Sequence, residues 1–212
     1  MRREDRSRRT TALPALISGG VSAVLLAFSM TPTFATLTAQ IVHSANTAGT
    51  GALIMQETDG TNTCNSTDGG SISTNSATCS TINEYGGNLA MVPGAAAVTN
   101  ITIKDTGTVA ASSFTLVGGT CAQTANGSAN GTAVDLCAKY TVLIQSGATT
   151  IYTGTAAALG GQTIDILSKL AVSNVAAGGS VPIKITATLD ATAGNTYQGL
   201  KISQPLTWNF GA

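Results

Sequence analysis

The stretch Val181-Pro182-Ile183-Lys184-Ile185-Thr186-Ala187-Thr188-Leu189 decides the fold class of this chain. Its odd-numbered residues are apolar, and its even-numbered residues are polar or proline. Because successive side chains of a β-strand point to opposite faces, this alternation predicts a strand with one buried face. Residues 200–210 follow the same rule, and their apolar members all share one parity: Leu200, Ile202, Leu206, Trp208 and Phe210.

Shorter segments with the same alternation predict further strands on the N-terminal side of these two. They are residues 37–42, 50–57, 101–104, 114–116, 140–145 and 148–152. Only residues 164–170 have a pattern that suits a helix, of one or two turns. Polar turn residues separate the segments at the spacing typical of antiparallel β-sandwiches, so the sequence predicts an all-β fold.

Two polar stretches, residues 58–90 and 118–136, are rich in Gly, Ser, Thr and Asn and have little periodicity. We expect surface insertions there, each restrained by a disulfide bond. The simplest of the three possible connectivities joins Cys64 to Cys79, 15 residues apart, and Cys121 to Cys137, 16 residues apart. Each bridge would contribute on the order of 3 kcal/mol, and the absence of CxxC-like spacing argues against a zinc site. Four paired cysteines favour an oxidising compartment.

The N-terminus has the features of an export signal. Five arginines lie within the first nine residues, an apolar stretch covers Ala12–Met30, and Thr33-Phe34-Ala35 offers a cleavage site after Ala35. A retained membrane anchor is the alternative, but the uninterrupted apolar part, Val21–Phe28, is shorter than the roughly 20 residues that span a bilayer. We therefore expect a signal peptide at 1–35, a single β-sandwich domain at 36–212, and no stable membrane anchor after cleavage.

Composition excludes two classes of protein. Hydrophobic residues make up 43% of the chain and charged residues 9%, which is unlike a charge-rich disordered polymer. Residues 36–212 contain five lysines, eight acidic residues and no arginine, so we expect no nucleic-acid partner.

Four segments follow one another in the mature chain: NTAGTGAL at 46–53, VPG at 92–94 with ITIKDTGT at 101–108, AGGSV at 177–181, and AGNTYQG at 193–199. Together they resemble motifs of the TasA/camelysin family of secreted bacterial proteins, whose members form extracellular matrix fibres. The resemblance covers most of the mature chain and leaves out the Cys-bearing insertions. It implies a jelly-roll-like sandwich, export through a dedicated signal peptidase, and self-assembly in which the N-terminal strand of one subunit completes the next.

The residues themselves also favour assembly. A segment beginning near Thr36 has β alternation and few charges, and the flexible residues 46–51 follow it. Such a segment can pair with its own sheet or with the exposed edge of a neighbour, where Leu37, Ala39 and Ile41 would fill pockets. The partner is then a second copy, in a homopolymer outside the cell or on its surface; other matrix or cell-surface components are further candidates. The alternatives are a strand folded into its own sandwich and a monomeric surface-binding module.

An enzyme is not expected, although some camelysin relatives carry a metallopeptidase label. The chain has one histidine, His43, and no HExxH string, so a zinc peptidase lacks its ligands. A serine nucleophile would need His43 as its partner, and no GxSxG motif is present. We interpret His43 as a packed or solvent-facing residue and expect no catalytic residue, metal or cofactor.

Two binding sites remain as alternatives. Glu57, Asp59 and Asp68 could supply oxygen ligands to calcium, but they lack the regular loop spacing of such sites, which favours solvated turn residues. Five aromatic residues could stack on sugars, although their scattered positions favour packing: Tyr85, Tyr140, Tyr152, Tyr197 and Trp208.

Overall fold

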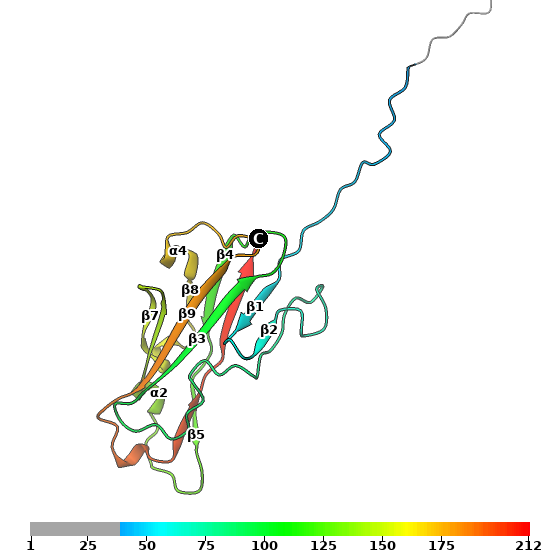
Figure 1. Cartoon of the computed structure of the whole chain (residues 1–212). Helices are drawn as coiled ribbons and strands as arrows, with labels where there is room; N and C mark the ends of the chain where they lie inside the picture. Colours follow the sequence, from blue (N-terminus) through cyan, green and yellow to red (C-terminus); the bar gives the residue numbers. More distant parts are fainter. Residues whose placement is uncertain (1–38) are drawn as a thin grey trace, which may run out of the picture. The chain divides into compact units, whose positions relative to one another are not determined.

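Two ten-residue strands, β3 (Ala96–Asp105) and β9 (Ser180–Leu189), form the centre of the fold (Figure 1). In the computed structural model, which describes residues 39–212, they pair antiparallel from Ala96 opposite Thr188 to Lys104 opposite Ser180. The odd-numbered residues of β9 are buried along the whole strand, as the alternation predicted.

These two strands lie inside a six-stranded antiparallel sheet with the order β2-β1-β3-β9-β6-β7. Its other members are β1 (Met55–Thr58), β2 (Thr63–Asn65), β6 (Tyr140–Ser146) and β7 (Thr149–Thr155). The hairpin predicted around residues 146–147 is confirmed, since β6 and β7 pair directly and Gly147 takes a φ of 56° in their turn.

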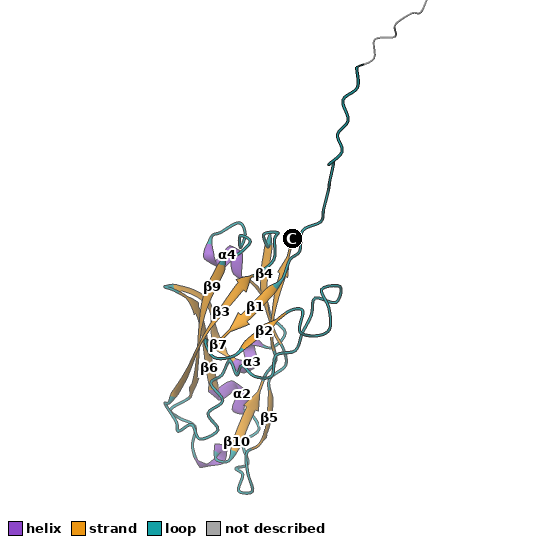
Figure 2. Cartoon of the chain, turned by 45° about the vertical axis from the view of Figure 1, so that its right-hand side comes forward, coloured by secondary structure: helices purple, strands orange, loops and turns teal. Residues whose placement is uncertain are grey.

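A second layer consists of a three-stranded sheet in the order β11-β4-β8 and a two-stranded sheet of β10 and β5. The strands are β4 (Ser113–Gly118), β5 (Ala122–Ala125), β8 (Thr163–Asp165), β10 (Leu200–Ser203) and β11 (Leu206–Gly211). The single final strand predicted at 200–210 is thus divided, because Pro205 has no N–H to donate to a ladder. Figure 2 shows β5 and β10 at the end of the sandwich that lies away from the C-terminus.

The hydrophobic core lies between the two layers. Ile103, Ile183 and Ile185 contribute from the six-stranded sheet, and Phe114 and Leu116 contribute from β4, all with at most 1% of their surface exposed. Burial of one such side chain stabilises the fold by roughly 1.5 to 3 kcal/mol. The predicted all-β antiparallel sandwich is confirmed.

Helical structure is confined to short pieces: α2 (Leu136–Lys139), α3 (Ala156–Leu159), α4 (Ile166–Leu170) and η1 (Asn195–Tyr197). The helix predicted at 164–170 is right only from Ile166 onward, because residues 163–165 pair with β4 as β8. The Asp165 side chain then caps α4 by accepting a hydrogen bond from the Ser168 N–H at 3.1 Å.

The two polar insertions are more ordered than predicted. Residues 58–90 include β2, and residues 118–136 include β5 and the start of α2. Alternation could not reveal strands of three and four residues, whose stability comes from pairing with β1 and β10. Both cysteine pairings occur as expected, with Cα–Cα distances of 5.9 Å for Cys64–Cys79 and 6.1 Å for Cys121–Cys137.

The described N-terminal residues, 39–48, form no strand and are exposed. The strand predicted at 37–42 is therefore wrong for the free chain over residues 39–42, since alternation without a partner strand leaves backbone groups unpaired. Ile41 has 85% of its surface exposed. Leu37 and the predicted signal peptide lie outside the described residues. The strand predicted at 50–57 begins only at Met55. Within residues 39–212, no helix is both long and apolar enough to cross a membrane.

Candidate functional site: a groove along a free strand edge

One edge of the second layer has no partner strand. Among residues 39–212, β11 pairs only with β4 and β10 pairs only with β5. We call the outer side of these two strands the β10–β11 edge. An unpaired edge presents a row of N–H and C=O groups that another strand can bind.

The hydrogen-bond register identifies which backbone groups point outward. The Gly119 N–H donates to Pro205 O at 2.8 Å, and the register of β11 with β4 places these two residues opposite each other. Pro205 and Gly119 therefore form a hydrogen-bonded pair. Such positions alternate in antiparallel pairs, and the backbone groups of Thr207 and Asn209 therefore face β4. Those of Leu206, Trp208 and Phe210 face the free edge.

A groove of about 1040 Å³ runs along this edge. Both polar and apolar residues line the groove, and polar atoms make up more than half of the exposed lining. The apolar side chains from the strands on its two sides are Met55, Ile103, Leu206, Trp208 and Phe210. The ring of Phe114 supports the lining from below, with its centroid 4.9 Å from that of Phe210 and 5.9 Å from that of Trp208. The groove thus offers apolar contacts within a mixed lining and lies beside unpaired backbone groups.

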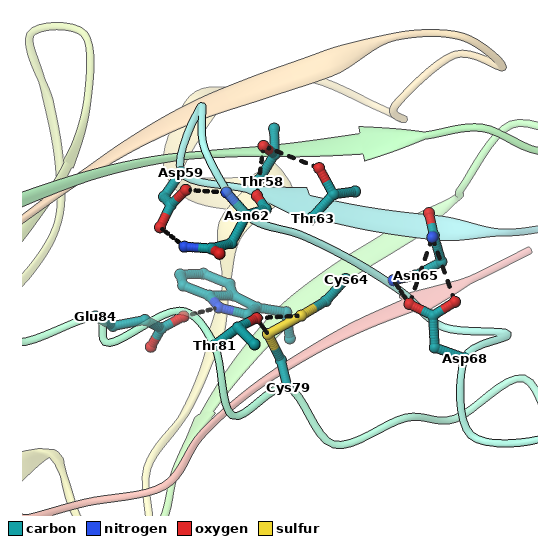
Figure 3. The surroundings of a disulfide bond; sticks show 11 residues. Thr58, Asp59, Asn62, Thr63, Cys64, Asn65, Asp68, Cys79, Thr81 and Glu84 are labelled. Carbon is teal, nitrogen blue, oxygen red and sulfur yellow. Dashed lines mark hydrogen bonds between the residues drawn. A yellow bond between two sulfur atoms is a disulfide. The ribbon is translucent and has the colours of Figure 1, made fainter.

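Residues of the segment 76–91 also line the groove, and we call this segment the covering segment. The disulfide bond from Cys79 to Cys64 attaches its beginning to β2, with Thr81 Oγ1 3.6 Å from both sulfur atoms (Figure 3). Ile82 is buried in the core. The segment therefore has a covalent anchor and an apolar anchor.

Two side-chain hydrogen bonds join the covering segment to the β10–β11 edge. The Trp208 indole N–H donates to Glu84 Oε1, and Figure 3 draws this hydrogen bond as the dashed line that ends at Glu84. The Tyr85 hydroxyl donates to Gln204 Oε1 at 2.6 Å. The Gln204 amide in turn donates to Gly119 O at 2.7 Å and Ala156 O at 2.9 Å, which holds the break between β10 and β11 in place.

The site contains a pair of carboxyl groups, Glu57 on β1 and Glu84 on the covering segment. Burial raises the pKa of Glu84 to about 8, the Trp208 N–H lowers it, and Glu57 raises it further. Burial also raises the pKa of Glu57; the adjacent side chain of Glu84 opposes this effect, and the charge of Asp59 adds to it. Burial and the charge of Glu84 raise the pKa of the Tyr85 phenol.

The structure brings together aromatic residues that are scattered in the sequence. Tyr85, Tyr140, Tyr197 and Trp208 all line the groove, whereas the Tyr152 hydroxyl donates to Thr155 O at 2.8 Å within β7. Four residues that are scattered in the sequence thus line one groove, because strands distant in sequence lie beside one another. Trp208 is only 7% exposed, so its faces are packed rather than open to a ligand.

The remaining predicted site residues lie apart. The carboxylate of Asp59 accepts the N–H groups of Thr61 at 2.8 Å and Asn62 at 2.6 Å, and these bonds lower its pKa. Asp68 accepts the Asn65 N–H at 2.7 Å in a separate turn.

His43 is exposed, and its backbone carbonyl accepts a hydrogen bond from the Asn46 side-chain amide at 3.2 Å. Within the part of the chain that the structure describes, no three His, Cys, Asp or Glu side chains gather to hold a metal ion.

Sequence reasoning missed Glu84 and Gln204, and it did not pair Glu57 with Glu84. One signal was available: Ile82, Glu84 and Tyr85 are large side chains that lie close together in a stretch made mostly of small residues, which is unusual for a solvated loop. The contact of Glu84 with Trp208, 124 residues later, left no sequence signal. No protein-family model matches this sequence, and a comparison with curated proteins returns no match.

Proposed function

We propose that this chain is a secreted structural protein, without enzymatic activity, that self-assembles into fibres outside the cell or on its surface. The N-terminal segment of one copy, residues 36–42, adds a strand to the β10–β11 edge of the next. The observation that carries this proposal is the unpaired edge, which lies beside a groove with apolar side chains from both layers. The resemblance to TasA/camelysin proteins, with its jelly-roll-like arrangement, is consistent with it.

Hydrogen bonding favours strand addition at this edge. The outward N–H and C=O groups of Leu206, Trp208 and Phe210 are spaced to pair with an added strand. A seven-residue segment extends over roughly 23 Å at about 3.3 Å per residue, which fits within the length of β10 and β11 together. Main-chain bonds would supply the joint, as in other strand-addition complexes.

Side-chain chemistry favours the same occupant. Residues 36–42 read TLTAQIV, contain no charge, and place Leu37, Ala39 and Ile41 on one face of a strand. The groove beside the edge offers apolar lining from Met55, Leu206 and Phe210. Burial of three apolar side chains, each worth roughly 0.5 to 3 kcal/mol according to size, would stabilise the joint.

The free chain leaves the donor residues available. Ala39 and Ile41 lie outside any strand and are exposed, so they have formed no sheet pairing that must first be broken. A second copy can therefore supply the missing strand without first unpairing it from a sheet of its own. The two disulfide bonds support the placement of this chain in an oxidising, extracellular environment.

Electron microscopy of the mature protein, residues 36–212, tests the proposal. The wild-type protein should form filaments, and a variant lacking residues 36–42 should remain a folded monomer, because it keeps the acceptor edge and loses the donor. Circular dichroism of the truncated protein checks that the sandwich persists. Filaments in both samples would contradict strand donation, and filaments in neither would contradict self-assembly.

A second candidate function is sugar binding, because Tyr85, Tyr140 and Tyr197 line one groove. Aromatic rings in such a site stack on sugar faces. Tyr197 is already engaged, since its hydroxyl donates to Asp135 Oδ1 at 2.8 Å. Titration of the monomeric truncated protein with soluble polysaccharides, followed by Trp208 fluorescence, separates the two: saturable binding that Tyr85→Ala and Tyr140→Ala abolish would favour this candidate.

A further inference from the structure

The covering segment lies over the same edge that the proposed assembly needs. Its hold on that edge consists of the Trp208–Glu84 and Tyr85–Gln204 hydrogen bonds and the burial of Ile82. Its beginning is fixed covalently at Cys79. Away from the edge, Asn126 Nδ2 donates to Leu89 O at 2.7 Å and Thr99 Oγ1 donates to Asn83 O at 3.3 Å. If residues 80–91 leave the edge, the disulfide bond keeps them attached to the molecule.

The charges around the Trp208–Glu84 contact are unbalanced. Glu84 lies against Glu57 on β1, and Glu57 Oε1 is buried without a hydrogen-bond donor. Asp59, which follows β1, acts on Glu57. Glu84 in turn acts on the phenol of Tyr85, which Tyr152 also affects. Every one of these groups is acidic.

Compensating cations are scarce at this position. Lys201 is the lysine that lines the groove, and it makes no ion pair in the described chain. The ion pair found among residues 39–212 joins Lys139 to Asp190, neither of which contacts the carboxyl pair. Two ionised carboxylates that lie close together in a partly buried site repel each other. A proton held between Glu57 and Glu84 removes that repulsion and supplies the donor that Glu57 Oε1 lacks.

We propose that Glu57 and Glu84 form a proton-dependent latch, which holds the covering segment on the β10–β11 edge while they share a proton and releases residues 80–91 when that proton is lost to solvent. Release places Glu84 in water, where its carboxylate is well solvated. The disulfide bond at Cys79 keeps the movement local. The latch itself is independent of assembly; its consequence, an edge opened to a donor strand, rests on the proposed function.

The direction of the switch follows from proton binding. The pKa of Glu84 is about 8 in the closed state, and an exposed glutamate has a pKa of about 4.5. Between these two pH values the closed state binds one more proton than the released state. In that range the ratio of released to closed molecules rises by about tenfold for each pH unit. Above it, both states are ionised at Glu84, and the ratio no longer changes.

Fluorescence of Trp208 reports the latch directly, because Trp208 is the single tryptophan of the chain. The mature protein is kept monomeric, as checked by light scattering, and its emission is recorded from pH 5 to pH 9. We expect a reversible shift to longer wavelength as the pH rises, while the far-UV circular dichroism of the strands stays constant. No shift in the wild type would overturn the proposal, and so would a shift that accompanies loss of the strand signal.

Three variants make the test specific. Glu57→Gln with Glu84→Gln keeps an acceptor for the Trp208 N–H and removes both titrating groups, so the shift should disappear. Glu84→Gln alone should greatly reduce it. Asp68→Asn, a matched carboxylate-to-amide change in an exposed turn, should leave the shift intact. A shift that persists in the double variant would refute the latch.

The outcomes separate this inference from the proposed function. If the fluorescence shift occurs and the mature protein forms no filaments at any pH, the latch stands and self-assembly is wrong. If filaments form with no shift at any pH, strand donation stands and the latch is wrong.

Discussion

Replacement of Ile41 by Asp tests the groove through a single side chain. Ile41 is 85% exposed in the free chain, and its position in the sequence has the same parity as those of Leu37 and Ala39. If it enters the groove on assembly, Ile41→Asp forfeits roughly 1.5 to 3 kcal/mol of apolar burial and also buries a carboxylate. Since about 1.4 kcal/mol corresponds to a tenfold change in affinity, the critical concentration for assembly should rise at least about tenfold.

The adjacent residue supplies the control. Val42 is 68% exposed and has the opposite parity, so its side chain points away from the groove in a paired strand. Val42→Asp introduces the same charge one residue away and should change the critical concentration by less than about threefold. Sedimentation of assembled protein over a range of total concentrations measures both values. Equal effects of the two substitutions would refute the reasoning, because parity would then be irrelevant.

Three further predictions follow from the site and its surroundings. The pKa of Glu84 is raised, so its contribution to stability is fully present below about pH 4.5 and is lost as the pH rises to about 8. The free energy of unfolding, measured by urea denaturation, should fall across this range in the wild type and fall much less in Glu84→Gln. The same pH dependence in both proteins would contradict the assignment. Cys64→Ala with Cys79→Ala opens a 15-residue loop and should lower the free energy of unfolding by about 3 kcal/mol, measured by the same method, and no change would show that the bridge does not restrain the unfolded chain. His43→Ala should leave folding and filament formation unchanged, and a metal-dependent peptidase activity in the wild type that this variant lacks would overturn the non-enzymatic interpretation.

The central strands could be predicted from the sequence because each buries a full face. In β9, five apolar side chains alternate with polar ones, and this pattern persists wherever the strand lies in the sheet. Strands such as β2 and β5 escaped prediction, because three or four residues carry too little pattern and their pairing depends on the rest of the fold. Residues 39–42 show the opposite case, in which alternation is present and the free chain supplies no partner strand.

The site was harder to predict than the fold. Its parts come from β1, the covering segment and β11, and the Trp208–Glu84 bond joins residues 124 positions apart. The sequence placed Glu57 with Asp59 and Asp68 because they are neighbours in the chain, whereas strand alternation turns the side chain of Glu57 toward Glu84 instead. The alternation of apolar residues at 200–210 was predicted correctly. Whether these strands lie at a free edge depends instead on the strand order, which the alternation does not reveal.

Amide hydrogen exchange along β11 tests the central claim most directly. In the monomer, the Thr207 and Asn209 amides donate to β4 and should exchange slowly, whereas the Trp208 and Phe210 amides face the free edge and should exchange faster. In filaments, a donated strand should protect Trp208 and Phe210 as well, to the level of their neighbours. Unchanged exchange at Trp208 and Phe210 after assembly would contradict strand addition at the β10–β11 edge.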